Sequence, residues 1–277
     1  MSDIVITEFI DDWAVDDLRR DFTVHYDPTL VERPDEIALV AASSPALIVR
    51  NRTQIRGPVL AACKALKVIG RLGVGLDNID LDECARRAVL VCPATGANAV
   101  AVAEYVIAAI LVAFRDVWRA NAAVLAGTWP RNELMLGEAS GKRLGLVGFG
   151  AIARAVARRA RALEMEMVGL DPAVGAGDPA WAAHGVARVE WPALLETSDI
   201  ISLHVPLTPQ TRNLFDAAAF ARMKQGAVLI NTARGGIVEE PALAEALKAG
   251  KLGAAVLDVY ASEPVAVGSV LAGVPRL

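Results

Sequence analysis

Several signals that would point to particular classes of protein are missing from this sequence. There are 28 Lys and Arg residues against 32 Asp and Glu residues, giving a net charge of -4, so no basic excess favours a nucleic acid or an anionic membrane as partner. The three cysteines, Cys63, Cys84 and Cys92, lack the close pairing of a thiolate metal site, and their odd number argues against a secreted disulfide framework. We therefore expect a cytoplasmic protein that acts on a small molecule and holds no metal.

Long hydrophobic runs are also missing. The longest apolar stretch, residues 99–114, is interrupted by Glu104 and is shorter than the ~20 apolar residues of a spanning helix. A strand-like run at residues 4–7 follows Met1 almost at once and leaves no room for a signal peptide. The sequence contains no H-E-x-x-H motif, so a metal hydrolase is not credible. With 54% hydrophobic and 22% charged residues, a soluble protein with a large core is expected.

The order of the predicted elements indicates an α/β fold. Short runs of Val, Ile and Leu, predicted as strands, alternate with helical patterns at residues 4–7, 46–50, 67–71, 89–91, 143–147, 166–171, 199–204, 227–231 and 254–258. Such alternation predicts right-handed βαβ units, and nearly continuous apolar strands predict parallel sheets covered on both faces. One helical pattern from Asn98 to about Leu125, followed by a loop-like stretch at 127–141, divides the chain into two α/β halves.

The strongest local signal is a glycine-rich turn between a strand and a helix. Residues 148–153 read Gly-Phe-Gly-Ala-Ile-Ala, a form of the G-x-G-x-x-G/A pattern with Ala153 in the third position. Gly148 would allow the tight turn, and Gly150 would let the backbone approach a pyrophosphate at the helix N-terminus. An ordinary strand-to-helix turn is the alternative for this pattern taken alone.

An acidic residue in the next strand strengthens the dinucleotide interpretation. Asp171 follows Gly148 by 23 positions, at the end of the strand 166–171, where a carboxylate can accept hydrogen bonds from the adenosine ribose hydroxyls. Its charge would repel a 2′-phosphate, so NAD is favoured over NADP. The alternative is that Asp171 only opens a turn before Pro172.

Six ordered motifs make the sequence resemble the D-isomer-specific 2-hydroxyacid dehydrogenases, which include phosphoglycerate dehydrogenases. Besides the glycine turn 148–150, they are Arg71-Leu-Gly-Val-Gly-Leu-Asp-Asn-Ile-Asp80, Asn98-Ala-Val-Ala-Val-Ala-Glu104, His204-Val-Pro-Leu-Thr208, Asn231-Thr-Ala-Arg-Gly-Gly236 and Asp258-Val-Tyr-Ala-Ser-Glu-Pro264. The resemblance implies a Rossmann dinucleotide-binding domain at 98–270, inserted into a flavodoxin-like substrate domain at 1–97. Residues 271–277 would begin the return to the substrate domain, and the active site would lie between the domains.

The same resemblance implies roles for individual residues. Arg234 would orient the substrate carboxylate and keto oxygen with its planar donor fork, and Glu263 would hydrogen-bond a catalytic histidine. The substrate-binding residues would be Gly73, Val74, Gly75 and Asn98. Apart from the resemblance, Arg50 is a possible further cation near this loop. The cofactor-binding residues would be Gly148, Gly150, Ala151, Ile152, Asp171, Pro172, His204, Val205, Pro206, Thr232, Ala233 and Asp258.

Several of these residues also have a plainer interpretation. Taken alone, Arg234 could be a surface charge and Glu263 an exposed glutamate. The glycines at 73 and 75 could form a tight turn, Asn98 could cap a helix, and His204 could pack at a strand end. Arg50, Arg52 and Arg131 could supply cations for a second anionic group such as phosphate or sulfonate, or be solvated surface charges.

One part of the family pattern is missing from the residues present. The proton of the C2 hydroxyl needs an acceptor, and the family places a histidine shortly after the motif that contains Glu263. The three histidines of this sequence, His25, His184 and His204, all precede Glu263, so we expect a truncated version of a longer chain with an incomplete catalytic site.

Two alternatives to a working dehydrogenase remain open: a dinucleotide-sensing protein like the corepressors of this fold, and a catalytically inactive NAD-binding protein. The helix from Asn98 matches the family's dimer helix, so the resemblance also implies a homodimer.

Overall fold

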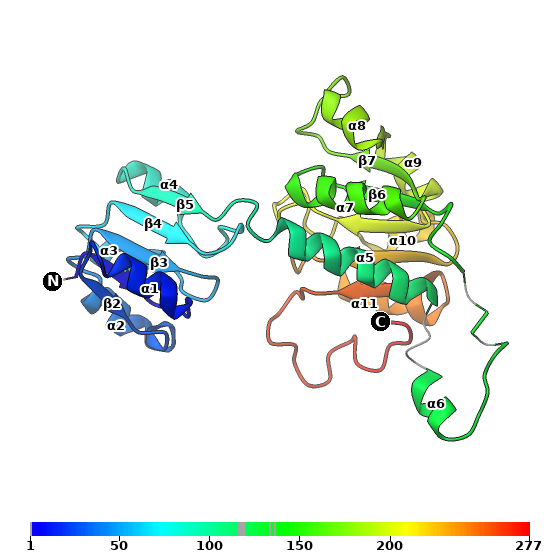
Figure 1. Ribbon diagram of the computed structural model, residues 1–277, viewed down its shortest axis with the longest axis horizontal. Coiled ribbons are helices and arrows are strands. Elements are labelled where there is room, and N and C mark those ends of the chain that lie inside the picture. The colour runs from blue at the N-terminus through cyan, green and yellow to red at the C-terminus, as the bar shows by residue number, and fades with distance from the viewer. Residues whose placement is uncertain (1, 116–119, 133, 136) are drawn as a thin grey trace. The chain divides into compact units, whose positions relative to one another are not determined.

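The structure is a computed structural model that describes residues 2–115, 120–132, 134–135 and 137–277. The chain forms two compact units, Met1–Asn98 and Ala99–Leu277. Each is described by itself below, and Figure 1 shows the elements of both. None of the helices that the structure describes combines the length and the hydrophobicity needed for a membrane span.

Unit 1 is built on a five-stranded parallel sheet with the strand order β2-β1-β3-β4-β5. This is the flavodoxin-like order. Its elements are β1 (Ile4–Ile6), α1 (Asp12–Leu18), β2 (Val24–Tyr26), η1 (Leu30–Glu32, a 3₁₀ helix), α2 (Pro34–Val40), β3 (Ala46–Val49), α3 (Gly57–Ala62), β4 (Val68–Arg71), α4 (Leu81–Arg86) and β5 (Leu90–Pro93).

Both faces of this sheet are covered, which explains why its inner strands are continuously apolar. Val5 packs in a cluster with residues of α2, α3 and α4, whereas its neighbours Ile4 and Ile6 pack on the other face against Val15 of α1. Successive side chains of a strand point to opposite faces, so a strand buried on both sides needs apolar residues at every position.

Unit 2 contains a six-stranded parallel sheet with the order β11-β10-β9-β6-β7-β8. Read from the other edge, this is the Rossmann order. Its elements are α5 (Ala99–Arg115), α6 (Asn121–Leu125), β6 (Arg143–Val147), α7 (Ala151–Ala162), β7 (Glu166–Leu170), α8 (Pro179–His184), β8 (Ala187–Arg188), α9 (Trp191–Thr197), β9 (Ile200–Leu203), α10 (Ala217–Arg222), β10 (Ala227–Asn231), α11 (Glu240–Lys248) and β11 (Leu252–Leu257).

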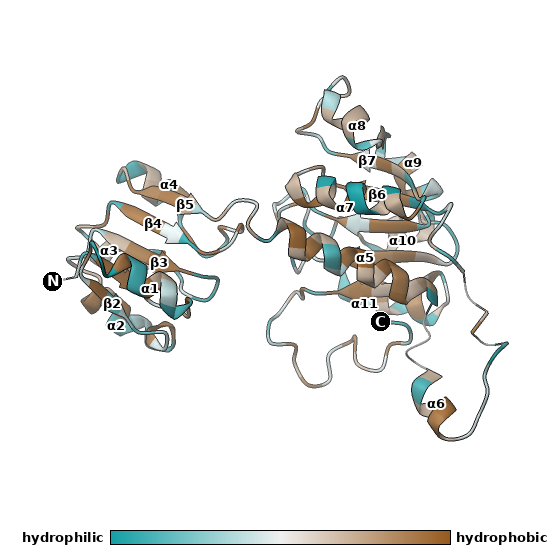
Figure 2. Cartoon of the chain, viewed as in Figure 1, coloured by the Kyte–Doolittle hydropathy of each residue, from teal (hydrophilic) through white to brown (hydrophobic). Residues whose placement is uncertain are grey.

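The helices of unit 2 cover the sheet in two layers. One hydrophobic cluster joins α5, α7 and α8 to one face, and a second joins α9, α10 and α11 to the other. Hydrophobic residues recur along α5 and the strands in Figure 2. The α/β class and the two sheet types predicted from the sequence are confirmed.

Two details differ from the predicted elements. The strands β2 and β8 were not predicted. Where one helical pattern from Asn98 to about Leu125 was expected, the structure describes α5 and a separate short helix α6; residues 116–119 between them lie outside the described residues. Residues 271–277 are grouped with unit 2, where the N–H of Ala255 donates to the carbonyl of Arg276, and their role as the start of a return to the substrate domain stays a prediction.

Candidate functional site

The turn between β6 and α7 has a conformation that requires glycine at its first position. Gly148 has φ +90°, and a Cβ built on it would lie 2.5 Å from the carbonyl oxygen of His204 and 2.9 Å from Cγ1 of Val205. The absent side chain therefore lets the loop after β9 approach the turn closely, between the two adjacent strands β6 and β9. This point is where the strand order of the sheet reverses, the usual position of a ligand in such folds.

Gly150 differs from Gly148 because the space beside it is open. It is the N-cap residue of α7 with φ -77°, and a Cβ built on it would meet nothing within 4 Å. The first N–H groups of a helix have no acceptor within the helix, and its dipole places partial positive charge there. The exposed Ala151 follows, and Ala153 is fully buried. A phosphate could thus approach the backbone at Gly150 without displacing protein atoms.

An aromatic stack anchors the middle of the turn. The buried ring of Phe149 lies on that of Trp181 with centroids 4.1 Å apart and an interplanar angle of 9°. Arg154 in the first turn of α7 donates from Nε to the carbonyl of Phe149 at 2.9 Å, and its guanidinium lies 5.3 Å from the Phe149 ring centroid. These contacts fix the backbone between the two glycines.

Asp171 follows β7 and holds the same turn through its carboxylate. Its Oδ2 accepts from the N–H of Phe149 at 2.7 Å, and its Oδ1 accepts from the N–H of Ala173 at 2.8 Å. Because each carboxylate oxygen offers about two acceptor sites, the partly exposed group can still accept from a ligand hydroxyl. The exposed Pro172 comes directly after it.

Two polar side chains at the ends of β9 and β10 have buried atoms with no hydrogen-bond partner among the described residues. These atoms are Nε2 of His204 and Oγ1 of Thr232. Leu203 pairs with Asn231 across the two strands, so His204 and Thr232 occupy neighbouring positions just beyond the sheet. Burial lowers the pKa of His204 to about 4, so its ring is neutral near pH 7. Buried polar atoms are rarely left unpaired. Oγ of Ser202 within β9 also has no partner among the described residues, but the atoms of His204 and Thr232 lie at the strand ends, where a polar ligand could complete them.

The loop after β10 is held by its own side chains and by the loop after β11. Asn231 donates from Nδ2 to the carbonyl of Arg234 at 2.9 Å and accepts from the N–H of Ala233 at 3.1 Å. A Cβ on Gly235 would lie only 1.7 Å from the carbonyl oxygen of Tyr260, so the two loops touch backbone to backbone. Arg234 is thereby set on a rigid loop, with its Nη1 donating to the carbonyl of Ala233 at 2.6 Å.

Two carboxylates lie close together after β11. Burial and the nearby Glu263 carboxylate raise the pKa of Asp258. The exposed Glu263 accepts from the N–H of Tyr260 at 3.0 Å. Burial, followed by Asp258 and Tyr260, also raises the pKa of Tyr105 on α5. Among the described residues no histidine hydrogen-bonds Glu263: His25 lies in β2, His184 bonds Ala180, and His204 lies after β9.

The predicted substrate loop of unit 1 follows β4. Gly73 has φ +146°, and a Cβ built there would lie 1.6 Å from Nη1 of Arg71, which donates to the carbonyl of Leu72 at 2.7 Å. The arginine side chain therefore lies against the glycine loop, and Val74 is partly exposed beyond it. The N–H of Gly73 donates to the carbonyl of Arg71 at 2.9 Å, so a carboxylate bound beside the Arg71 cation would use the N–H groups that follow Gly73 in this loop.

The remaining predicted substrate residues belong to different units. Arg50 is exposed just after β3 in unit 1, beside the loop that follows β4, because the N–H of Leu72 donates to the carbonyl of Val49. Asn98 is exposed immediately before α5. Arg131 is an exposed residue of unit 2.

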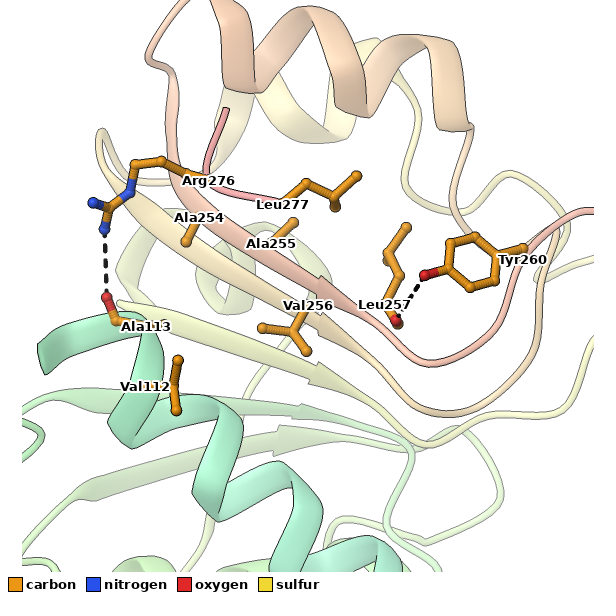
Figure 3. A pocket seen from close by; sticks show the side chains of 9 residues that line it. All are labelled: Val112, Ala113, Ala254, Ala255, Val256, Leu257, Tyr260, Arg276 and Leu277. Carbon is orange, nitrogen blue, oxygen red and sulfur yellow. Dashed lines mark hydrogen bonds between the residues drawn. The ribbon is translucent and has the colours of Figure 1, made fainter. Parts of the chain in front are cut away.

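A pocket of about 230 Å³ lies elsewhere in unit 2, between α5 and the edge strand β11. In Figure 3, Nη2 of Arg276 reaches the carbonyl of Ala113 at 3.4 Å, and the hydroxyl of Tyr260 donates to the carbonyl of Leu257 at 3.3 Å. None of the predicted site residues lines this pocket. Its mainly aliphatic walls offer little to orient an anionic substrate.

The glycine turn between β6 and α7 agrees with the result of a comparison with known families. Residues 107–277 match the model of the D-isomer specific 2-hydroxyacid dehydrogenase, NAD binding domain. The chain belongs to this family. This confirms three predictions from the sequence: the family, the enzyme class of NAD-dependent 2-hydroxyacid dehydrogenases, and NAD as the cofactor.

Individual relatives extend the likeness over the whole chain. The (S)-sulfolactate dehydrogenase of Chromohalobacter salexigens is 51% identical over all of this chain and 89% of its own length. The D-3-phosphoglycerate dehydrogenase of Archaeoglobus fulgidus is 40% identical over 94% of this chain, which spans only 49% of that protein. A crystal structure of a protein from Thermus thermophilus superposes with a TM-score of 0.87 at 33% identity, covering 99% of this chain and 86% of that one.

Sequence reasoning missed several residues that shape the site. Phe149 and Trp181 stack across 32 positions, and no local pattern links them. Only the aromatic residue between two glycines could have drawn attention to Phe149. Glu8 and Asn78, both buried polar residues of unit 1, were also missed.

Proposed function

We propose that the chain transfers a hydride between NAD and C2 of a small D-2-hydroxy acid or the corresponding 2-keto acid. The observation that carries this proposal is the edge formed by the ends of β6, β7, β9 and β10. There an open glycine turn, an ordered carboxylate and two unpaired buried polar atoms lie on neighbouring parallel strands.

These residues fit the parts of a dinucleotide. The N-terminus of α7 at Gly150, Ala151 and Ile152 would take the pyrophosphate, and Asp171 with Pro172 would take the adenosine ribose. The nicotinamide half would lie along residues 204–206 and 232–233, where His204 and Thr232 would find their missing partners, with Asp258 at the carboxamide. Bound NAD would supply the hydride acceptor for the oxidation of C2.

The remaining proposed residues bind and orient the substrate. The N–H groups of the Gly73, Val74 and Gly75 loop would hold the carboxylate, with Arg50 and Asn98 as further contacts. Arg234 would bind the carboxylate and the C2 oxygen together, which stabilises the charge that develops there during reduction. Glu263 would orient the residue that exchanges the C2 hydroxyl proton.

The substrate we favour carries a second anionic group. The relative named (S)-sulfolactate dehydrogenase is similar over the full chain. (S)-Sulfolactate has the D arrangement at C2, because sulfur gives the sulfomethyl group priority over the carboxyl group in naming the centre. The exposed arginines at the sheet edge of unit 1, Arg50 and Arg52, provide cations for such a sulfonate.

The test is a pair of measurements on the purified chain. NADH fluorescence titration reports cofactor binding, and loss of NADH absorbance with sulfopyruvate, 3-phosphohydroxypyruvate, pyruvate and glyoxylate reports hydride transfer. We expect binding of NADH and faster reduction of the two keto acids that carry a second anionic group, sulfopyruvate and 3-phosphohydroxypyruvate. Failure to bind NADH would overturn the cofactor site, and binding without reduction of any of the four would overturn the reaction.

We also propose a homodimer that forms through α5. Val100, Tyr105 and Val112 are exposed hydrophobic residues of this helix. A mass of one chain in light scattering after gel filtration would contradict the proposal.

The relatives described above are named as enzymes, so a corepressor-like or inactive NAD-binding protein gains no support from them.

A further inference from the structure

A buried carboxylate in unit 1 holds the loop that follows β3. Glu8, directly after β1, is 5% exposed. Its Oε1 accepts from the N–H groups of Arg50 at 2.8 Å and Thr53 at 3.0 Å, and its Oε2 accepts from the N–H of Arg52 at 3.1 Å. Burial alone would raise the pKa of Glu8, but these hydrogen bonds outweigh it and lower the pKa below its ordinary value. The carboxylate is therefore ionised when the loop is in place.

A buried amide holds two residues of the same segment through their carbonyls. Nδ2 of Asn78 donates to the carbonyl of Arg50 at 3.0 Å and to that of Thr53 at 2.7 Å. The hydroxyls of Thr7 and Thr53 are also 2.8 Å apart. In the segment 50–53, which we call the arginine loop, Glu8 thus binds three backbone N–H groups and Asn78 binds two backbone carbonyls.

The side chains of the arginine loop are not used in the same way as its backbone. Arg50 is exposed, and within the part of the chain that the structure describes its guanidinium makes a single 3.5 Å contact, from Nη1 to the carbonyl of Phe9. Arg52 is exposed and lies 3.7 Å from Glu32 in a solvated ion pair. Exposed pairs of this kind contribute little to stability. The backbone bonds to Glu8 and Asn78 hold the loop, whereas the weak contacts of the two guanidinium groups add little to its stability. Both guanidinium groups therefore remain available to a ligand.

We propose that Glu8 is a positioning residue for substrate selection: by fixing the N–H groups of Arg50, Arg52 and Thr53, it presents the two arginines to the second anion of the substrate. This inference rests on the proposed function, since it concerns the same substrate. It predicts that Glu8 governs the preference for dianionic over monoanionic 2-hydroxy acids and not the binding of NADH.

The test compares two ligands that differ only at C3, (S)-sulfolactate and D-lactate. Their dissociation constants are measured by calorimetry with NADH bound, a combination that cannot react because both partners are reduced. Glu8→Gln leaves one acceptor oxygen and turns an NH₂ group toward the rest of the loop. We expect it to weaken sulfolactate binding about 3- to 10-fold and D-lactate binding less than about twofold.

Four further variants separate positioning from a general structural effect. Glu32→Gln removes only the exposed partner of Arg52 and should leave both dissociation constants unchanged. Arg52→Ala should lower sulfolactate affinity. Glu8→Gln should reduce that affinity less in the Arg52→Ala background than in the unaltered chain, because the two substitutions act on one interaction. Glu8→Asp keeps both oxygens and should restore part of the preference.

Equal losses for the two ligands in Glu8→Gln, or additive losses in the double variant, would overturn the inference. A sulfolactate preference that is absent from the unaltered chain would overturn it as well. Because these are binding measurements, they stand even if the chain fails to transfer hydride, whereas the proposed function depends on that transfer.

Discussion

Changing each of the two glycines of the β6–α7 turn to alanine should have different effects: Gly148→Ala should lower both stability and NADH affinity, and Gly150→Ala mainly NADH affinity. At Gly148 the positive φ of +90° costs an alanine about 1–2 kcal/mol. The new Cβ would also lie 2.5 Å and 2.8 Å from the carbonyl oxygen and carbon of His204, which are backbone atoms that cannot rotate away. Overpacking of this kind adds about 1–3 kcal/mol.

The expected loss for Gly148→Ala is therefore about 2–5 kcal/mol, or a fall of about 5–15 °C in the Tm of unit 2. Displacing the turn also moves the N–H groups at the start of α7, so we expect NADH affinity to fall at least about tenfold. Scanning calorimetry measures the first effect and NADH fluorescence titration measures the second.

Gly150→Ala separates the cofactor from the fold. With φ -77° and no atom within 4 Å of the new Cβ, the change should move the Tm by less than about 3 °C. NADH affinity should still fall at least about tenfold, because the methyl group occupies the space that we assign to the pyrophosphate. Gly177→Ala, an exposed and equally open site, controls for the substitution and should change neither quantity. NADH affinity unchanged in Gly150→Ala would refute this reasoning.

Three other predictions concern single residues. Asp171→Asn should weaken NADH binding about tenfold and reduce the preference for NADH over NADPH, because the substitution removes one acceptor oxygen and the negative charge. The dissociation constants of NADH and NADPH measure both effects. Since the pKa of His204 lies at about 4 in the folded chain against 6.5 ordinarily, the unfolded chain binds more protons between these values. Stability should therefore fall as the pH drops from 6.5 towards 4, and His204→Asn should flatten this dependence in urea titrations. Arg234→Lys should lower kcat/KM for a 2-keto acid about 100-fold while leaving the NADH dissociation constant unchanged, because lysine lacks the planar fork.

The features predicted from sequence are those whose cause is local. A strand, a glycine turn and an amphipathic helix occur within twenty residues of one another between Arg143 and Ala162, so their pattern was sufficient. The strands β2 and β8, of three and two residues, are too short to show a period and are incompletely buried. Their pairing with β1 and β7 comes from the sheet that already exists.

Glu8 could not be recognised for a related reason. A glutamate after a strand is ordinarily a surface residue, and its burial here depends on N–H groups more than forty positions away. The same holds for the unpaired atoms of His204 and Thr232, which become unusual only when β9 and β10 lie side by side. A local sequence pattern does not show whether a buried polar group has a hydrogen-bond partner far along the chain. The structure shows that Glu8 has such partners and that, among the described residues, the buried atoms of His204 and Thr232 do not.

Asp171 and Glu8 illustrate how similar contacts lead to different functions. Each follows a parallel strand, and each captures N–H groups of the loop after an adjacent strand: Asp171 that of Phe149, and Glu8 those of the arginine loop. Asp171 is partly exposed and retains acceptor sites, so it can bind a ligand hydroxyl while it holds the turn. Glu8 is buried with three donors already in place, so it can influence a ligand only through the loop that it fixes. Substitution of Asp171 should therefore alter cofactor binding directly, whereas any effect of Glu8 on substrate binding must vanish once the arginines of its loop are removed.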